Sequence, residues 1–556
     1  MHKSGAKQWN IPHASGNNQQ RELDKNYRTA FCPVGSSTHF VQNGGALMIA
    51  FSLQRWTLLV TVGTGLLLIA IDITILYTAL PVLTRELGAS NSEGLWIINA
   101  YPLLTAGLLL GAGTLGDRIG HRKMFLGGLV LFGFASLAAA FSPTPSTLIA
   151  SRAFQAIGAS AMMPATLALI RIAFDDERER NMAIAVWASL SLIGAVLGPL
   201  LGGVLLAHFW WGSIFLVNVP IVALTFLVAW FVAPYARPDL SRPWDLRSSI
   251  QILIALSSLV AAIKEMANGN PSWPILATTT ILFFGAGTLF VRRQSRLAYP
   301  LVDFALFRNP AFLSGALGAA FVTFATGGLL LTIAQRYQWV AGYTPLQAGL
   351  LVSAIFLGTL PSSLLGAALV NRLGLRFLLA GGLAVASLGV LLVASGPALG
   401  LGWLIAGLTV VGTGLGATIS VASATIVGNA PAHRAGMASS VEEVSYEFGS
   451  LFAVAILGSA LAAIYSIAIE LPAGSPDAAR ISIADTLALA HENGANSKAL
   501  IEAASKAFDQ SFVMVMGIVA AVLLTGAALL GFLLRSTDGI STKSVQEYAH
   551  NKEENS

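Results

Sequence analysis

Residues 113–123 read GTLGDRIGHRK and residues 368–376 read ALVNRLGLR. Each stretch is a short basic loop between two long apolar runs. When the two are aligned, four positions of the first match four of the second: Asp117, Arg118, Gly120 and Arg122 match Asn371, Arg372, Gly374 and Arg376. A loop that recurs at corresponding places predicts a chain built from two related halves.

Composition sets the class of protein. The 556 residues are 55% hydrophobic and 11% charged, with a mean hydropathy of +0.71, whereas soluble domains are roughly 25% charged. A β-barrel would show alternating segments of about ten residues, which this sequence lacks. We therefore expect an all-α integral membrane protein with about fourteen spans of about 20 apolar residues. They lie near 56–83, 94–114, 123–142, 147–170, 181–206, 212–234, 248–266, 272–291, 311–335, 346–370, 377–396, 401–428, 435–466 and 510–534.

The span pattern predicts a domain organisation. We expect a disordered N-terminal tail (1–47, with translation beginning at Met48), a six-helix half (48–234), two inserted helices (235–310), a second six-helix half (311–535) and a disordered tail (536–556). Segment 467–509 reads as a hairpin of two amphipathic helices. Most loop Lys and Arg fall on one side, so the positive-inside rule places that side and both termini in the cytoplasm, with the hairpin outside.

Two glycine-rich patterns have a direct structural meaning. The first loop combines residues that form a tight turn with residues that cap helix ends and pair across a gate: Gly113, Gly116, Asp117, Arg118, Gly120 and Arg122. The fifth span carries small residues about four apart and a proline that kinks the helix: Gly194, Gly198, Pro199, Gly202 and Gly203. Small residues at this spacing allow close helix contact.

Ionisable residues inside the spans are the candidate functional groups, because charges at membrane depth are costly and usually mark an ion or substrate path. They are Asp72, Arg152, Glu442, Glu443 and Glu447. Glu443 and Glu447 are one helical turn apart and share a face. Burial and mutual repulsion favour the neutral form of such a pair, so we expect proton uptake there. Some of these acids could instead be hydrogen-bond partners between helices, and Arg152 could reach the membrane surface.

Aromatic residues near these positions suit flat cations through cation–π attraction. The candidates are Tyr77, Trp96, Tyr101, Trp187 and Tyr446. Because most aromatic residues in spans serve packing or the interfacial belt, we expect only two or three of them to contact substrate.

Taken together, the chain from about residue 55 to 535 resembles the major facilitator superfamily, in particular its fourteen-span drug:proton antiporters. GTLGDRIGHRK resembles motif A of that superfamily, Arg152, Gln155 and Gly158 resemble motif B, and the Gly194–Gly203 array resembles the exporter motif C. The resemblance implies alternating access of two halves and a part for Arg152 in proton transfer. The surroundings of Asp72 and Glu443 are similar to those in exporters of quaternary-ammonium compounds, which implies substrates such as methyl viologen, ethidium, acriflavine and biocides. It also implies the bacterial inner membrane.

Other classes of function find little support. The lone Cys32 excludes a disulfide framework, no Cys and His cluster has metal-ligand spacing, and the glycine-rich stretches lack the GxxxxGK[ST] order of a phosphate loop. We therefore expect no enzyme activity, no cofactor and no nucleic-acid partner, and a monomer driven by the proton gradient. Two alternatives stay open: a proton-coupled exporter of an endogenous metabolite, and a membrane sensor that transports nothing.

Overall fold

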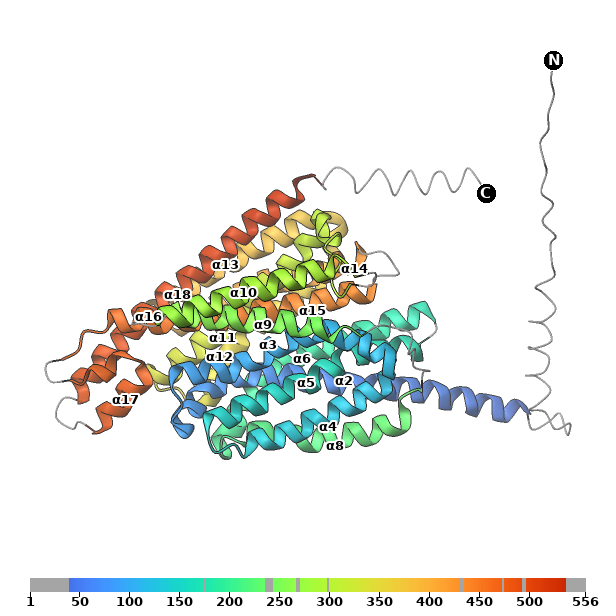
Figure 1. Ribbon diagram of the computed structural model, residues 1–556, viewed down its shortest axis with the longest axis horizontal. Coiled ribbons are helices and arrows are strands. Elements are labelled where there is room, and N and C mark those ends of the chain that lie inside the picture. Colours follow the sequence, from blue (N-terminus) through green and yellow to red (C-terminus); the bar gives the residue numbers. More distant parts are fainter. Residues whose placement is uncertain are drawn as a thin grey trace, which may run out of the picture. The chain divides into compact units, whose positions relative to one another are not determined.

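The computed structural model describes residues 40–174, 176–235, 244–266, 271–297, 300–429, 435–472, 475–492 and 497–536. These residues form helices and no strand, and fourteen of the helical segments are long and apolar enough to cross a membrane (Figure 1). The predicted fold class and number of spans are confirmed. By their contacts the residues divide into two units, Met1–Trp56 and Thr57–Ser556. The bundle of spans is the second unit.

The first of the six N-terminal spans begins within the expected tail. Their helices are α2 (Phe40–Leu87), α3 (Asn91–Ile119), α4 (His121–Ala140), α5 (Pro145–Ala173), α6 (Glu177–His208), and the consecutive α7 (Ser213–Leu216) and α8 (Asn218–Val232). The tail was expected to be disordered as far as residue 47, but residues 40–47 are the first turns of α2, in which no proline occurs before Pro81. Residues 1–39 and 537–556 lie outside the described part, and with them the rest of the two predictions of disordered tails.

The remaining spans follow in the order that the hydropathy predicts. The inserted pair is α9 (Leu246–Met266) and α10 (Trp273–Gln294), followed by the short η1 (Leu306–Arg308). The last six spans comprise α11 (Pro310–Trp339), α12 (Pro345–Leu373), α13 (Leu375–Leu399), α14 (Leu401–Gly428), the composite span of α15 (Ala435–Phe452), η3 (Ala453–Gly458) and α16 (Ser459–Ala468), and finally α18 (Ser497–Leu533), which ends in η5 (Leu534–Ser536). The segment η3 is a π-helix.

Corresponding turns in the two halves have the same backbone geometry. Gly120 separates α3 from α4 with φ 99°, and Gly374 separates α12 from α13 with φ 79°. Side chains other than glycine rarely adopt such positive φ angles. The helices that precede these turns also begin alike, since Ser90 and Thr344 each form a capping box. The duplication that the two loops predict is therefore present in the backbone.

The outer segment differs from the expected hairpin in one respect. Its first arm is α17 (Ile483–Glu492), preceded by η4 (Asp477–Arg480), but its second arm is not a separate helix. Residues 497–509 are the first turns of α18, which continues without a break into the last span. The reason lies in the sequence, since no glycine or proline occurs between Ser497 and Gly517. The turn at 493–496 lies outside the described residues.

Glycines of α6 bring three helices into close contact. A Cβ placed on Gly194, Gly198 or Gly202 would lie 2.7, 2.0 or 2.7 Å from atoms of α2, and one on Gly203 would lie 2.5 Å from the Cα of Leu346 in α12. In return, a Cβ on Gly349 of α12 would lie 2.3 Å from the Pro199 carbonyl oxygen. The spacing therefore has the packing role expected of it, and α6 lies between the first span and a span of the other half.

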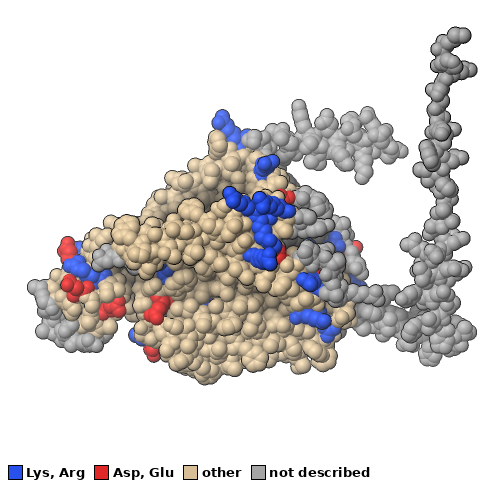
Figure 2. Space-filling model, in the orientation of Figure 1, with Lys and Arg blue, Asp and Glu red and all other residues tan. Residues whose placement is uncertain are grey.

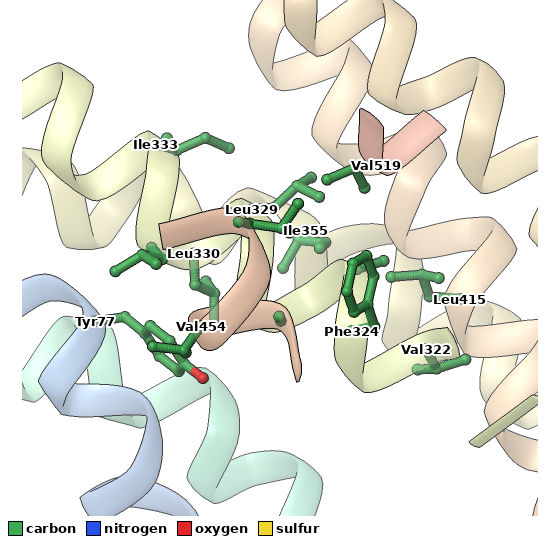
Figure 3. Packing of buried hydrophobic residues seen from close by; sticks show 14 of the residues in the cluster. Tyr77, Val322, Phe324, Leu329, Leu330, Ile333, Ile355, Leu415, Val454 and Val519 are labelled. Atoms are coloured by element: carbon green, nitrogen blue, oxygen red, sulfur yellow. The ribbon is translucent and has the colours of Figure 1, made fainter. Parts of the chain in front are cut away.

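The apolar core is shared between the halves. One cluster of buried residues runs from α2 and α3 to α11, α12, α14 and α18, and in Figure 3 Tyr77 of α2 lies beside Val454 of η3. A second cluster joins Leu103 of α3 and Val260 of α9 to Leu451 of α15 and Ala455 of η3. The inserted helix α9 thus lies along the seam between α3 and the α15–η3 span. The other inserted helix, α10, packs on α9 and is otherwise exposed, with only 6% of its span buried.

Charged side chains are distributed unevenly over the bundle. In Figure 2 the end that carries α17 shows most of the visible acidic groups together with some basic ones, whereas the visible charges at the opposite end are mainly Lys and Arg. This is the asymmetry on which the expected orientation rests.

Candidate functional site

Asp72 and Arg152 form an ion pair in the interior of the first six spans. Asp72 lies in the second half of α2, and Arg152 lies two turns into α5, whose N-cap is Thr144. Arg152 Nη1 donates a hydrogen bond to Asp72 Oδ2, and the two side chains are 1% and 0% exposed. Arg152 therefore does not reach the membrane surface.

Three neutral polar side chains complete this cluster. Gln155 accepts a hydrogen bond from Arg152 Nη1 at 2.7 Å through Oε1, and its Nε2 donates to Asp72 Oδ1 at 3.2 Å and to Ser136 Oγ at 2.8 Å. Asn218, the first residue of α8, donates to Asp72 Oδ1 at 3.0 Å. Asp72 thus accepts hydrogen bonds from three side chains. Sequence analysis missed Ser136 and Asn218, whose only signal is that each is polar within a long apolar run.

Aromatic rings cover the guanidinium of Arg152. Its Cζ lies 4.7 Å from the ring centre of Tyr101 and 6.0 Å from that of Phe215. Arg152 Nε and the Tyr101 hydroxyl are both buried, and neither has a hydrogen-bond partner among the described residues. Such unpaired buried groups are rare and costly in folded proteins.

The three glutamates of α15 occupy different environments. Glu442 is half-buried and accepts a hydrogen bond from the Tyr446 hydroxyl at 3.0 Å and another from Ser423 of α14. Glu442 is therefore the kind of hydrogen-bond partner between helices that was considered as an alternative. Glu443 and Glu447 interact electrostatically with each other, and within the described part of the chain neither accepts a hydrogen bond. Glu447 is only 6% exposed.

Of the three glutamates, Glu447 is the one that interacts with the cluster around Asp72 in the first half. Glu447 interacts electrostatically with Arg152 and with Tyr101. Close by, the Tyr77 hydroxyl of α2 and Ser450 Oγ of α15 are 3.0 Å apart and hydrogen-bonded. Arg152 therefore lies between a carboxylate to which it is bonded, Asp72, and a second one within electrostatic range, Glu447.

The five candidate aromatic residues divide into two groups. Tyr77, Tyr101 and Tyr446 lie beside the acidic groups. Trp96 lies under Lys264 of α9, whose Nζ is 4.5 Å from the ring centre, and Trp187 of α6 donates a hydrogen bond to Thr166 of α5 at 3.1 Å. The three tyrosines thus lie near the acidic groups, whereas the two tryptophans make contacts between helices.

The first basic loop fastens helices at one end of the bundle. Asp117 and His121 are 3.0 Å apart across the Gly120 turn, and a Cβ on Gly116 would lie 2.8 Å from the His121 ring. Arg122 donates to the carbonyl oxygen of Trp230 and stacks on its ring, so it caps the last turn of α8. Gly113 approaches the other half, since a Cβ there would lie 4.0 Å from Ser440 of α15. Arg118, like Arg122, is half-buried.

A sequence model described as Major Facilitator Superfamily matches residues 62–341. The chain belongs to this superfamily. A second model, described as sugar (and other) transporter, matches residues 309–469 of this superfamily member.

Individual relatives extend the likeness over most of the chain. The methyl viologen resistance protein SmvA of Salmonella typhimurium is 37% identical over 490 residues, which cover 86% of this chain and 98% of SmvA. The multidrug efflux pump LfrA of Mycolicibacterium smegmatis is 35% identical over 491 residues, which cover 87% of this chain and 97% of LfrA. Among solved structures, an inward-facing bacterial homologue of the human lysosomal transporter Spinster matches with a TM-score of 0.61 at 18% identity, covering 87% of this chain and 97% of the other. This last likeness concerns the fold alone.

Proposed function

We propose that this superfamily member is a proton-coupled antiporter that exports lipophilic and quaternary-ammonium cations, such as methyl viologen, ethidium, acriflavine and cationic biocides. The names of SmvA and LfrA support export of this kind of compound. The observation that carries the proposal is the pair Glu443 and Glu447, which interact with each other inside the bundle and accept no hydrogen bond from a described residue.

Competition for this pair provides the coupling. Two neighbouring carboxylates in a site of low dielectric do not readily ionise together, so one of them holds a proton while the site is empty. A lipophilic cation that enters between Tyr77, Tyr101 and Tyr446 favours the ionised form and expels that proton. The reverse exchange on the other side of the membrane releases the cation. The cycle requires no covalent step and no cofactor.

Asp72 takes a less direct part in cation binding than the sequence analysis expects. Its carboxylate already accepts hydrogen bonds from Arg152, Gln155 and Asn218. A cation reaches this group only after Arg152 has moved, and Glu447 is the second carboxylate toward which Arg152 is attracted. We propose that a shift of Arg152 from Asp72 toward Glu447 accompanies proton movement between the halves.

The membrane setting follows from the same reasoning. A bacterial inner membrane supplies a proton gradient, in which each charge that crosses carries about 2.3 kcal/mol per 100 mV. The mainly basic end of the bundle in Figure 2 faces the cytoplasm in this proposal, with α17 outside and both termini inside. We propose that a single chain suffices, because both acidic clusters lie within it.

Efflux of methyl viologen and of ethidium from an exporter-deficient bacterium tests the proposal. Cells that express the protein should expel both cations, and an uncoupler should abolish efflux. Glu443→Gln and Glu447→Gln should each lose at least tenfold in rate at equal expression. Glu502→Gln, which changes an exposed acid of α18, is the matched control and should retain the wild-type rate.

Two other outcomes would overturn the proposal. Efflux that persists in full with the uncoupler would exclude proton coupling. No efflux of either cation from a well-expressed wild type would favour an exporter of an endogenous metabolite, or a sensor if no proton-dependent flux of any compound is found.

A further inference from the structure

The inserted helices α9 and α10 carry three exposed arginines at the ends that the proposed orientation places in the cytoplasm. Arg247 lies in the first turn of α9, Arg292 lies in the last turn of α10, and Arg296 follows two residues after that helix ends. None of the three makes a hydrogen bond or an ion pair with another residue in the described part of the chain. In Figure 2 basic side chains gather on the visible face where these helix ends lie.

A buried polar network holds the ends of the two helices together beneath these exposed arginines. Arg293 donates to Asp245 Oδ1 through Nε at 3.1 Å and through Nη2 at 2.8 Å. The Gln294 side chain donates to Ser248 Oγ at 2.6 Å and accepts from the backbone N–H of Leu301 at 2.7 Å. Asp245, Ser248 and Gln294 are all buried. The network therefore fixes the backbone from which the three exposed arginines extend.

The length of α10 places these arginines at the level of the lipid headgroups. Its uncharged part, residues 273–291, covers about 28 Å at 1.5 Å per residue, and the hydrocarbon core of a bilayer is about 30 Å thick. Trp273 is exposed at the outer end of this stretch, and Trp244 is exposed beside the start of α9. Tryptophan is enriched at both membrane–water interfaces. Arg292, which directly follows the uncharged stretch, thus lies where lipid phosphates lie.

Both the charge and the apolar surface at this end fit an acidic phospholipid. Arg292 and Arg296 are four residues apart and share one face of the chain, and a guanidinium binds phosphate through two parallel hydrogen bonds. Leu289 and Val291, just before them, are about half exposed, and α10 packs on no helix but α9 among those described. Acyl chains can therefore lie along α10 below a bound headgroup. A free phosphate ion would use the arginines alone.

We propose that Arg247, Arg292 and Arg296 bind the headgroup phosphates of acidic phospholipids in the cytoplasmic leaflet, such as phosphatidylglycerol, with the acyl chains along α10. The site depends on the orientation of the proposed exporter and lies apart from its acidic groups. It gives the inserted helix pair a ligand of its own, which is neither the exported cation nor the proton.

Native mass spectrometry of the detergent-solubilised full chain tests this site, with dioleoyl phosphatidylglycerol or dioleoyl phosphatidylcholine as the added lipid. We expect the wild type to bind phosphatidylglycerol at least tenfold more tightly than phosphatidylcholine. Each arginine near the membrane surface contributes roughly fivefold to such binding. The double variant Arg292→Gln with Arg296→Gln should therefore lose at least tenfold in affinity for phosphatidylglycerol. The double variant Arg292→Lys with Arg296→Lys keeps both charges and should lose less.

A matched control removes the same number of charges from the second half. Arg308 and Arg372 are also exposed, and Arg308→Gln combined with Arg372→Gln should leave the affinity for phosphatidylglycerol unchanged. If the double variant of α10 does not fold, Arg296→Gln takes its place, because Arg296 lies beyond the end of the helix. This single variant should lose roughly fivefold.

Three results would overturn the proposed lipid site. They are equal affinity of the wild type for the two lipids, an equal loss in the α10 variant and the control, and displacement of the lipid by inorganic phosphate at millimolar concentration. The last result would assign the arginines to a free anion. Because the assay measures binding without transport, a chain that binds phosphatidylglycerol but expels no cation would contradict the antiport and leave the lipid site standing.

Discussion

Removing either charge of the Asp72–Arg152 pair should destabilise the bundle, and Asp72→Asn should do so more than Arg152→Gln. Both side chains are at most 1% exposed, and removing one partner of a buried pair costs about 3–5 kcal/mol. After Arg152→Gln the carboxylate keeps its hydrogen bonds from Gln155 and Asn218 and can take up a proton. After Asp72→Asn the guanidinium cannot lose its charge. It keeps the Gln155 oxygen, the Tyr101 and Phe215 rings and a longer-range attraction to Glu447, but no hydrogen-bonded carboxylate among the described residues.

We therefore expect a loss of about 3–5 kcal/mol in the free energy of unfolding for Asp72→Asn and of about 1–3 kcal/mol for Arg152→Gln. Denaturant titration of the solubilised variants, together with the double variant, measures both values. The double variant has no unpaired charge, so its loss should be smaller than the sum of the two single losses by more than about 1 kcal/mol. Additive losses, or a larger loss for Arg152→Gln than for Asp72→Asn, would refute the reasoning.

Three further predictions concern packing and pH. In Gly198→Val the new Cβ would lie 2.0 Å from a threonine oxygen of α2. We expect this clash to lower the free energy of unfolding by about 1–3 kcal/mol and to reduce the folded yield on size exclusion. The control Gly127→Val, whose Cβ would meet nothing within 4 Å, should change neither quantity. Gly111→Val meets a serine of α9 at 2.5 Å and should reduce cross-linking between cysteines introduced into α3 and α9; undiminished cross-linking would contradict the close contact. Burial raises the pKa of Asp245, but hydrogen bonds from Arg293 and a nearby serine lower it more, so its pKa lies below the usual value. The ionised Asp245 therefore stabilises the folded protein fully above the usual carboxyl pKa, and this stabilisation is lost as the pH falls through the lowered pKa. We expect Asp245→Asn to weaken the fall in the free energy of unfolding at acid pH, measured by unfolding titrations over a range of pH.

The spans and the repeated turns could be predicted because each depends on local sequence. A stretch of about 20 apolar residues has few alternatives to crossing a membrane, and only glycine readily adopts the φ angles found at Gly120 and Gly374. The end of the outer hairpin was predicted wrongly for a related reason. The hairpin was predicted to end at residue 509 because the hydropathy changes there. The helix α18 runs through this point because it contains no helix-breaking residue there.

The interior of the site could be predicted only in part. The ionisable residues stand out because charge is rare in these spans, but which acids are paired depends on contacts between helices far apart in sequence. Asn218 meets Asp72 across 146 positions and Tyr77 meets Ser450 across 373. The periodicity of apolar residues and the composition carry no information on contacts between side chains so far apart in the sequence. For the same reason the sequence could not show which of the five candidate aromatic residues lie near the acids, or that α9 brings Lys264 over the ring of Trp96.

The position of α9 has a mechanical consequence. Towards α3 this helix is fastened by close glycine contacts and by a hydrogen bond of 2.9 Å from Lys264 to the Ser92 carbonyl oxygen. Towards Leu451 and Ala455 of the other half its buried contacts are apolar, and apolar contacts have no preferred direction. The helix α9 is thus held in place by close and directional contacts on the side of α3, and by non-directional apolar contacts on the side of the other half. In the proposed transport cycle we expect α9 to move with the first half and to slide over the second, so that the seam beside the acidic site stays closed to lipid.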